Sequence, residues 1–408
     1  MLFTLLMGSS ICNYLFQISM GRMLRIEEFG TLNVLLSILN VYTVPTTTIT
    51  MVISRYFAYY HAKKEDDKLR VFFRKSLLFV VLFSISMTVI ALLFSYPIKY
   101  YLRIDNYLYI FITIFIGGIS LITPLSLGPL QGLKDFSTLG TFNFIGAFFK
   151  LITGMILVYL GFSIFGALGG ILLGSVMLLL VGYFALRKYL TSTEDSSIDL
   201  DIQEIIRYVY PVLVCNLSLV MLTNIDLFMV KHYFDAIEAG LYSSAVLFGR
   251  IVFYVSSAIV TAMFPIVVQA NAKEDSSFDT LKKSLIYSGL FSLICIIGIF
   301  LFPKLTVSIL FGSHYLRAIP YFKLISIAIL PICLLSVLMN YFLAVGKTKV
   351  IAISMAFGSL LEIVLIFYFH KTIEEILLVM LFSGLFVVVI NFIYLFLYKN
   401  KISKSMFL

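Results

Sequence analysis

The chain of 408 residues is 61% hydrophobic and only 12% charged, whereas ordinary globular domains are about 45–50% apolar and 25% charged. A soluble core has no use for so much apolar surface, so we exclude a soluble enzyme or binding domain and predict a polytopic membrane protein. The net charge of +9 is spread over short segments between apolar runs. This pattern indicates lipid headgroups and membrane topology and excludes a nucleic-acid partner.

Apolar runs of about 17–25 residues, the length of a membrane-spanning helix, recur along the whole chain. The longest polar insert, at 187–207, divides these runs into two groups of six. We therefore predict an all-α membrane protein of about twelve transmembrane helices in two six-helix lobes. The N-terminal lobe covers 1–190, a cytoplasmic linker 191–206 and the C-terminal lobe 207–408. The predicted spans are 1–20, 31–55, 76–98, 106–127, 139–160, 164–186, 207–230, 240–264, 284–302, 319–343, 350–369 and 373–397.

The distribution of the thirty Lys and Arg residues predicts the orientation. With the N-terminus in the cytoplasm, eighteen fall in inner segments, nine in outer segments and three within or at the edge of spans. Such an excess of basic residues on one side marks the cytoplasmic side, so both termini are predicted there. The 39 Phe, 25 Tyr and no Trp indicate a bacterial source, and hence its plasma membrane.

An internal repeat relates the two groups of spans. The segment 28–32 (EFGTL) recurs as 239–242 (AGLY), and 62–66 (AKKED) recurs as 272–275 (AKED). Because each half has an even number of spans, the two copies have the same orientation, and parallel repeats of this kind build two-lobed transporters. The repeat therefore predicts a transporter with a cleft between its lobes.

Four charged residues fall inside predicted spans: Lys150, Asp226, Arg250 and Glu362. A lone charge at mid-span costs about 3 kcal/mol on insertion scales, so each should face a partner or a water-filled cavity. Lys150 and Glu362, 212 positions apart, are nearly equivalent in the repeat. The alternative to a transport pathway is a structural ion pair between spans, for which Asp226 and Arg250 are the best placed.

Polar residues at helical spacing extend these charges into stripes. In the eighth span the stripe contains Ser243, Arg250, Tyr254, Ser257 and Thr261, and in the second it contains Asn33, Asn40 and Thr47. Each single Asn, Ser or Thr has an alternative role as an interhelical hydrogen-bond partner, and Arg55 has one as an interfacial anchor. The predicted substrate pathway comprises Arg250, Lys150, Asp226, Glu362, Asn40, Asn33, Tyr254, Asn13 and Arg55.

The sequence gives no indication of an enzyme or a bound cofactor. The four histidines, His61, His232, His314 and His370, lie in loops or at span ends, without the spacing of metal ligands. The acidic segment 199–201 resembles the carboxylate pair of a glycosyltransferase, but it belongs to a polar linker without a catalytic domain. We predict neither a catalytic residue nor a metal site, and the only cofactor that the pattern admits is a coupling ion, H⁺ or Na⁺.

The segment 21–32 (GRMLRIEEFGTL) resembles the connection between the first two spans of the polysaccharide flippases, which export O-antigen and teichoic-acid repeat units. The segment 224–230 (NIDLFMV), followed by 238–242 (EAGLY), resembles their second-half motif. The similarity extends over the whole chain in span count, repeat and linker. In contrast to most members, which begin with a short basic segment, this chain enters its first span at once.

The resemblance implies two lobes in a V and alternating access. It also implies export of an oligosaccharide on a polyprenyl-pyrophosphate carrier, for which Arg250, Lys150 and Arg55 would supply positive charge. Implied partners are membrane lipids, the lipid-linked oligosaccharide, a polysaccharide polymerase and glycosyltransferases. An ion-coupled multidrug antiporter of the same superfamily is one alternative, but it would favour an acidic cavity. A membrane-embedded glycosyltransferase or polymerase is another, and it would need a large outer loop.

Overall fold

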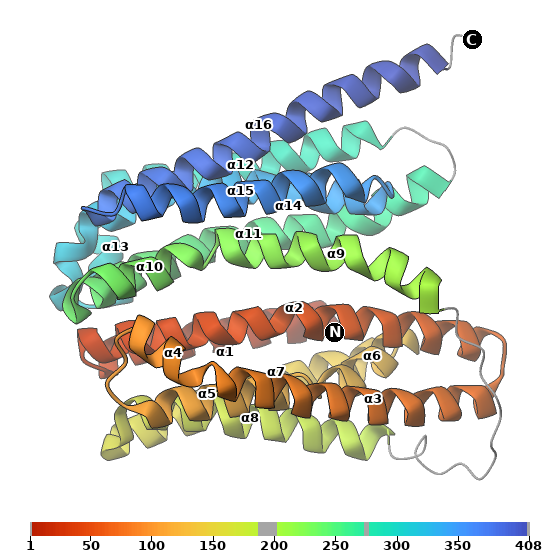
Figure 1. Cartoon of the computed structure of the whole chain (residues 1–408), viewed down its shortest axis with the longest axis horizontal. Coiled ribbons are helices and arrows are strands. Elements are labelled where there is room, and N and C mark those ends of the chain that lie inside the picture. The colour runs from red at the N-terminus through yellow and green to blue at the C-terminus, as the bar shows by residue number, and fades with distance from the viewer. Residues whose placement is uncertain (1, 187–201, 273–276, 406–408) are drawn as a thin grey trace. The chain divides into compact units, whose positions relative to one another are not determined.

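The computed structural model describes residues 2–186, 202–272 and 277–405, which are almost entirely helical and contain no strand. They form two compact units, Met1–Val209 (unit 1) and Tyr210–Leu408 (unit 2) (Figure 1). Most of the predicted linker at 191–206 lies outside the described residues. Unit 1 contains α1 (Leu2–Met23), α2 (Ile26–Ala62), α3 (Asp66–Leu93), α4 (Ser95–Tyr101), α5 (Tyr107–Ser120), α6 (Pro124–Gly132), α7 (Phe136–Leu157), the π-turn η1 (Val158–Phe162) and α8 (Ser163–Leu186). Helix α9 (Ile202–Leu222) begins before the boundary, and unit 2 contains the rest of it together with α10 (Ile225–Tyr233), α11 (Ala236–Ala272), α12 (Phe278–Leu301), α13 (Pro303–Leu310), the 3₁₀ turn η3 (Ser313–Ala318), α14 (Ile319–Ala344), α15 (Thr348–Tyr368) and α16 (Ile373–Ser405).

Ten stretches of the described residues are long and apolar enough to cross a membrane. One of them, 137–184, contains the two consecutive helices α7 and α8, and α1 is a further apolar helix of 22 residues. The stretch 137–184 therefore counts as two passes, so the ten stretches provide eleven passes. With α1 the described part of the chain makes twelve passes. The chain is therefore a multi-pass α-helical membrane protein, as predicted from its sequence.

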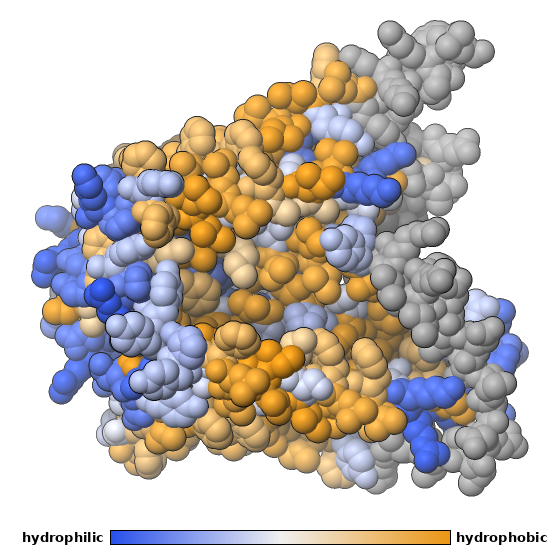
Figure 2. Space-filling model, viewed as in Figure 1, coloured by the Kyte–Doolittle hydropathy of each residue, from blue (hydrophilic) through white to orange (hydrophobic). Residues whose placement is uncertain are grey.

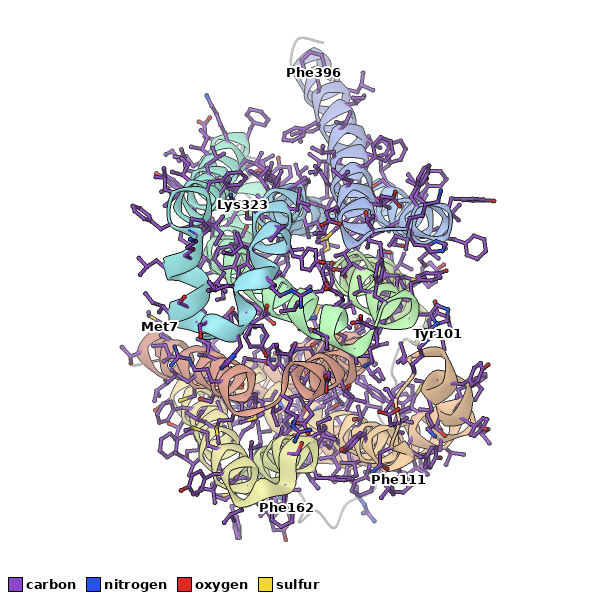
Figure 3. The ribbon with its side chains drawn as sticks, turned by 90° about the vertical axis from the view of Figure 1, so that its left-hand side faces the viewer. Met7, Tyr101, Phe111, Phe162, Lys323 and Phe396 are labelled. Carbon is purple, nitrogen blue, oxygen red and sulfur yellow. The ribbon has the colours of Figure 1, made fainter. Side chains whose placement is uncertain are left out.

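The outer surface of the helices suits a hydrocarbon environment. Hydrophobic residues cover the middle of the helices and hydrophilic residues gather toward their ends (Figure 2). Large apolar side chains such as Phe79 and Leu82 of α3 and Ile294 of α12 are more than half exposed, and Phe111 and Phe162 stand on the outside of unit 1 (Figure 3). Exposed apolar surface on this scale is unfavourable in water, so lipid must cover it.

The internal repeat is regular at the level of helix boundaries. Helices α2 and α11 both have 37 residues, and Ile26 and Ala236, their first residues, are 210 positions apart. The same offset relates Met23, the last residue of α1, to Tyr233, the last residue of α10. Residues of the first two helices in unit 1 can therefore be paired one to one with residues of unit 2.

Glycines allow α7 and α8 to pack with their backbones in near contact. A Cβ atom on Gly170 would lie 2.5 Å from the Cα of Gly154, and one on Gly174 would lie 2.8 Å from the Cβ of Lys150. Because Gly166, Gly170 and Gly174 follow one another at intervals of four, they form one face of α8. Small residues at this spacing let membrane helices approach closely and gain van der Waals contact.

The turn between α7 and α8 depends on one glycine and one hydrogen-bonded serine. Gly161 has φ 92° in the π-turn η1, a conformation that costs glycine little. Ser163 follows with φ 50°, and its hydroxyl donates to Oε1 of Glu28 at 2.6 Å. The other carboxylate oxygen of Glu28 accepts from the backbone N–H of Arg25 at 3.1 Å. Glu28 thus joins the start of α2 to the start of α8.

We expect Gly170→Val to destabilise the protein by about 1–3 kcal/mol, because the added side chain must push the α7 backbone away. Gly298→Val is the matched control, since a Cβ atom on Gly298 of α12 meets nothing within 4 Å. The measurement is the thermal unfolding of both purified variants in detergent. Equal melting temperatures for the two variants would contradict the close packing of α7 and α8.

Candidate functional site

Unit 2 brings three of the four predicted mid-span charges to one place. Asp226 is 1% exposed and lies in the first turn of α10, and the hydroxyl of Tyr242 donates to its Oδ2 at 2.5 Å. Arg250 on α11 donates through Nη2 to Oδ1 of Asn224 at 2.9 Å. Arg250 is also close enough to Asp226 to attract its carboxylate. Asp226 thus has a tyrosine as a partner and Arg250 has an amide, and the two charges also attract each other.

The interruption between α9 and α10 creates the position of Asp226. Helix α9 ends at Leu222 and α10 begins at Ile225, so the backbone N–H groups of the first turn of α10 are free of intrahelical partners. The positive end of the helix dipole favours the carboxylate of Asp226 in this first turn. Interrupted helices of this kind form substrate and ion sites in membrane transporters.

Glu362 on α15 is the second buried acid of unit 2, and its carboxylate oxygens lack hydrogen-bond donors among the described residues. The side chain is 0% exposed, and Asp226 is near enough to repel it electrostatically. Both carboxylate oxygens of Glu362, and Oδ1 of Asp226, are buried without a hydrogen-bond partner among the described residues. Burying an unpaired ionised carboxylate costs several kcal/mol. A bound proton or small cation would remove this cost.

Ser383 on α16 lies at the level of Glu362 in the packing of α15 on α16. Asn391 donates to Oγ of Ser354 at 2.8 Å, and a Cβ atom on Gly358 would overlap the side chain of Val387. Each step of four along α15 is matched by a step of four back along α16, so this register predicts Ser383 opposite Glu362. Ser383 is 0% exposed, and its hydroxyl is also buried without a hydrogen-bond partner among the described residues.

Lys150 is the fourth mid-span charge, and its partners in unit 1 are neutral. Its ammonium group donates to Oδ1 of Asn13 and lies 4.9 Å from the centre of the Phe16 ring, at cation–π distance. The amide of Asn13 in turn donates to the backbone oxygen of Ser9 at 3.0 Å. Asn13 is exposed, so the polar end of Lys150 reaches a surface of unit 1 between α1 and α7.

The two units differ in polarity at equivalent positions. At the offset of 210, Phe16 stands where unit 2 has Asp226, and Leu32 stands where it has Tyr242. Phe16 and Leu32 are both buried, so unit 1 replaces the acid and its hydroxyl donor by an apolar pair. Lys150 replaces Glu362. One ancestral framework therefore holds an acidic group in unit 2 and a basic group in unit 1.

The other residues of the predicted pathway are spread along α2 and α11. Asn33 is 2% exposed and donates to the backbone oxygen of Phe29, one turn earlier in α2, at 2.9 Å. This bond lies within one helix, so it is not the interhelical hydrogen bond of the alternative role. Arg55 lies 22 positions further along α2, about 33 Å away at 1.5 Å per residue. Asn40 is half-buried between them. Tyr254 on α11 is 54% exposed. Asn33 and Arg55 therefore do not share one site.

Residues 18–320 match the model of a family described as polysaccharide biosynthesis protein. The chain belongs to this family. No curated protein sequence matches the chain.

Solved structures confirm the predicted all-α, two-lobe fold class. An inward-facing multidrug resistance MATE family transporter of the MOP superfamily has a TM-score of 0.82 at 13% identity, with 97% of this chain and 96% of that chain covered. The lipid II flippase MurJ, in an inward closed conformation, has a TM-score of 0.76 at 13% identity, covering 97% and 87%. A MOP superfamily transporter from Pyrococcus furiosus has a TM-score of 0.69 at 14% identity, covering 96% and 93%. The chain therefore has the fold of the MOP superfamily.

We expect Tyr242→Phe to cost about 1–3 kcal/mol of stability, because it leaves Oδ2 of Asp226 buried without this donor. Asp226→Asn removes the charge that needs the donor. In a double-mutant cycle measured by thermal unfolding, Asp226→Asn should be less damaging in the Tyr242→Phe background than in the wild type. Additive effects of the two substitutions would show that the Tyr242–Asp226 hydrogen bond makes no contribution.

Proposed function

We propose that the protein carries a lipid-linked oligosaccharide, on a polyprenyl-pyrophosphate carrier, across the bacterial plasma membrane by alternating access. The family match to polysaccharide biosynthesis proteins and the fold shared with a lipid II flippase support a sugar-lipid substrate. The two-to-one excess of Lys and Arg in the inner segments supports cytoplasmic termini. In this role the chain is a carrier rather than an enzyme, and its partners are the polymerase and glycosyltransferases that consume and make the substrate.

The observation that carries this proposal is the neutral environment of Lys150. Its hydrogen-bond partner is the amide oxygen of Asn13 and its other neighbour is the Phe16 ring. An ammonium group whose partners among the described residues are neutral has no carboxylate competing for it, so it is available to an anionic ligand, and a pyrophosphate offers several acceptor oxygens. A carrier for cationic drugs would favour a carboxylate here instead. Lys150 therefore favours the flippase over the multidrug antiporter.

The acidic group of unit 2 supports coupling of transport to a proton or Na⁺. Asp226, Glu362 and Ser383 together present buried oxygen atoms without hydrogen-bond partners among the described residues. Carboxylates and a hydroxyl are suitable ligands for either ion, and the neighbouring Arg250 supplies a positive charge that competes with it. Separate sites for the anionic substrate and the coupling cation follow from the different polarity of the two units.

We expect Lys150→Ala to reduce surface polysaccharide export by about ten-fold or more, because a buried charged contact to phosphate is lost. Lys150→Arg retains the charge and should keep most of the activity. The measurement is polysaccharide export in a strain that depends on the variant, at equal protein levels. Wild-type export by Lys150→Ala would disprove the assignment of the substrate site.

We expect Glu362→Gln to abolish the dependence of export on the coupling ion gradient, and Ser383→Ala to weaken it by a smaller factor. The gradient is identified by comparing a proton-selective with a sodium-selective ionophore. Glu374→Gln, an acidic residue in the first turn of α16, is the control and should respond to the ionophores as the wild type does. Coupling that persists unchanged in Glu362→Gln would place the ion site elsewhere.

A further inference from the structure

We infer that Glu238, Tyr321 and Tyr242 form a path for protons between Asp226 and the end of unit 2 where α10 meets α11. This inference rests on the proposed ion coupling at Asp226 and Glu362, and it does not depend on the identity of the sugar substrate. The path starts from the hydrogen bond of Tyr242 to Asp226. It ends at the exposed side chain of Arg317 in η3.

Two of the three residues lie on consecutive turns of α11. Glu238 is in the first turn of the helix and Tyr242 follows four residues later, so they share one face about 6 Å apart along the axis. Tyr321 of α14 contacts both of them. Its hydroxyl donates to Oε2 of Glu238 at 2.7 Å, and its ring centre is 6.3 Å from that of Tyr242, at an angle of 68°. Tyr321 is therefore the link between the surface acid and the buried tyrosine.

Exposure rises steadily along this series of residues. Asp226 and Tyr242 are at most 1% exposed, the Glu238 side chain is 26% exposed, and Arg317, whose Nη2 lies 3.6 Å from Oε1 of Glu238, is 76% exposed. Every residue from Tyr321 inward carries a hydroxyl or a carboxyl group. Such groups both accept and donate protons, whereas a path for Na⁺ would need several oxygens around each ion. The chemistry therefore favours a proton.

Proton transfer along the path leaves each tyrosine with its hydroxyl group, because each one gains a proton as it loses its own. A proton taken from water onto Glu238 passes to the oxygen of Tyr321 as the Tyr321 proton leaves toward Tyr242. The step between the two tyrosines requires one bridging water, a common device between polar groups beyond direct reach. Tyr242 accepts this proton and gives its own to Asp226. One O–H bond breaks for each that forms, and one proton has moved from the surface to the buried acid.

Charged neighbours surround both ends of the path. Around Asp226 they are Arg250 of α11 and Glu362 of α15, and Lys231, five residues further along α10, is 4% exposed and makes its own contacts. Around Tyr321 they are Glu238, Arg317 and Glu374, the last in the first turn of α16. A net negative field near the surface end attracts protons to it.

Unit 1 has the surface acid but lacks the rest of the path. Glu28 is equivalent to Glu238 at the offset of 210, and it accepts a hydrogen bond from Ser163. Leu32 stands at the position of Tyr242 and Phe16 at that of Asp226. In unit 1 the surface acid Glu28 therefore joins two helices. The tyrosine Tyr242 is present only in unit 2, the unit that also has the buried acids.

The test is the rate at which the buried carboxyl groups equilibrate after a pH jump, with the full chain in lipid nanodiscs. Time-resolved infrared spectroscopy follows the C=O band of protonated carboxyl groups, and the band that is lost in Glu362→Gln or Asp226→Asn is the relevant one. We expect Tyr321→Phe and Glu238→Gln to slow its response by about ten-fold or more, in line with the loss of one proton-transfer group. The final amplitude should be unchanged, and Glu238→Asp should largely restore the rate.

Tyr315→Phe is the control, because this buried tyrosine of η3 lies outside the path and its loss tests for general loosening of that end. Wild-type rates in both Tyr321→Phe and Glu238→Gln would overturn the path while leaving the coupling proposal intact. Equal slowing in Tyr315→Phe would also overturn it. The absence of any pH-dependent band assigned to Asp226 or Glu362 would overturn proton coupling at this group and the path together, and would leave Na⁺ as the coupling ion.

Discussion

A charged or hydrogen-bonding group in hydrocarbon must find its partner within the protein, because lipid offers none. This constraint explains why the backbone is helical almost throughout and why most polar side chains in the spans bond to their own helix, as Asn33 does to Phe29. It also makes the exceptions informative. The oxygens of Asp226 and Glu362 without partners among the described residues and the neutrally held Lys150 depart from the rule, and the proposed function assigns the binding and release of charge to them.

The fold was predictable because hydropathy, span length and repeat are properties of long segments. Twelve passes, two six-helix groups and the helical class followed from runs of apolar residues, and the offset of 210 between Ile26 and Ala236 is visible in the sequence as well. Helix breaks were less accessible. The interruption at 223–224 lies inside one apolar run, where neither glycine nor proline marks the end of a helix.

The site was predictable only in part. Charged residues in apolar segments are conspicuous, so Lys150, Asp226, Arg250 and Glu362 could be selected directly. Tyr242 and Ser383 could not, because tyrosine and serine are common in membrane helices and only packing shows which of them face an acid. A usable signal did exist for Ser383: the rows 354, 358, 362 and 383, 387, 391 match when α15 and α16 are aligned as an antiparallel pair.

The near contact of the α7 and α8 backbones has a mechanical consequence. With Gly154 and Gly170 in direct apposition and Gly174 against Lys150, the two helices have almost no side-chain layer that could rearrange between them. Rotation of one against the other would produce a backbone clash, so the pair must move as a single rigid body. Lys150 is anchored in this pair at its Cβ, and its ammonium group is therefore displaced with the pair rather than independently of it. In the proposed role, any movement of this hairpin would therefore change the distance between the charge and the phosphate of the substrate.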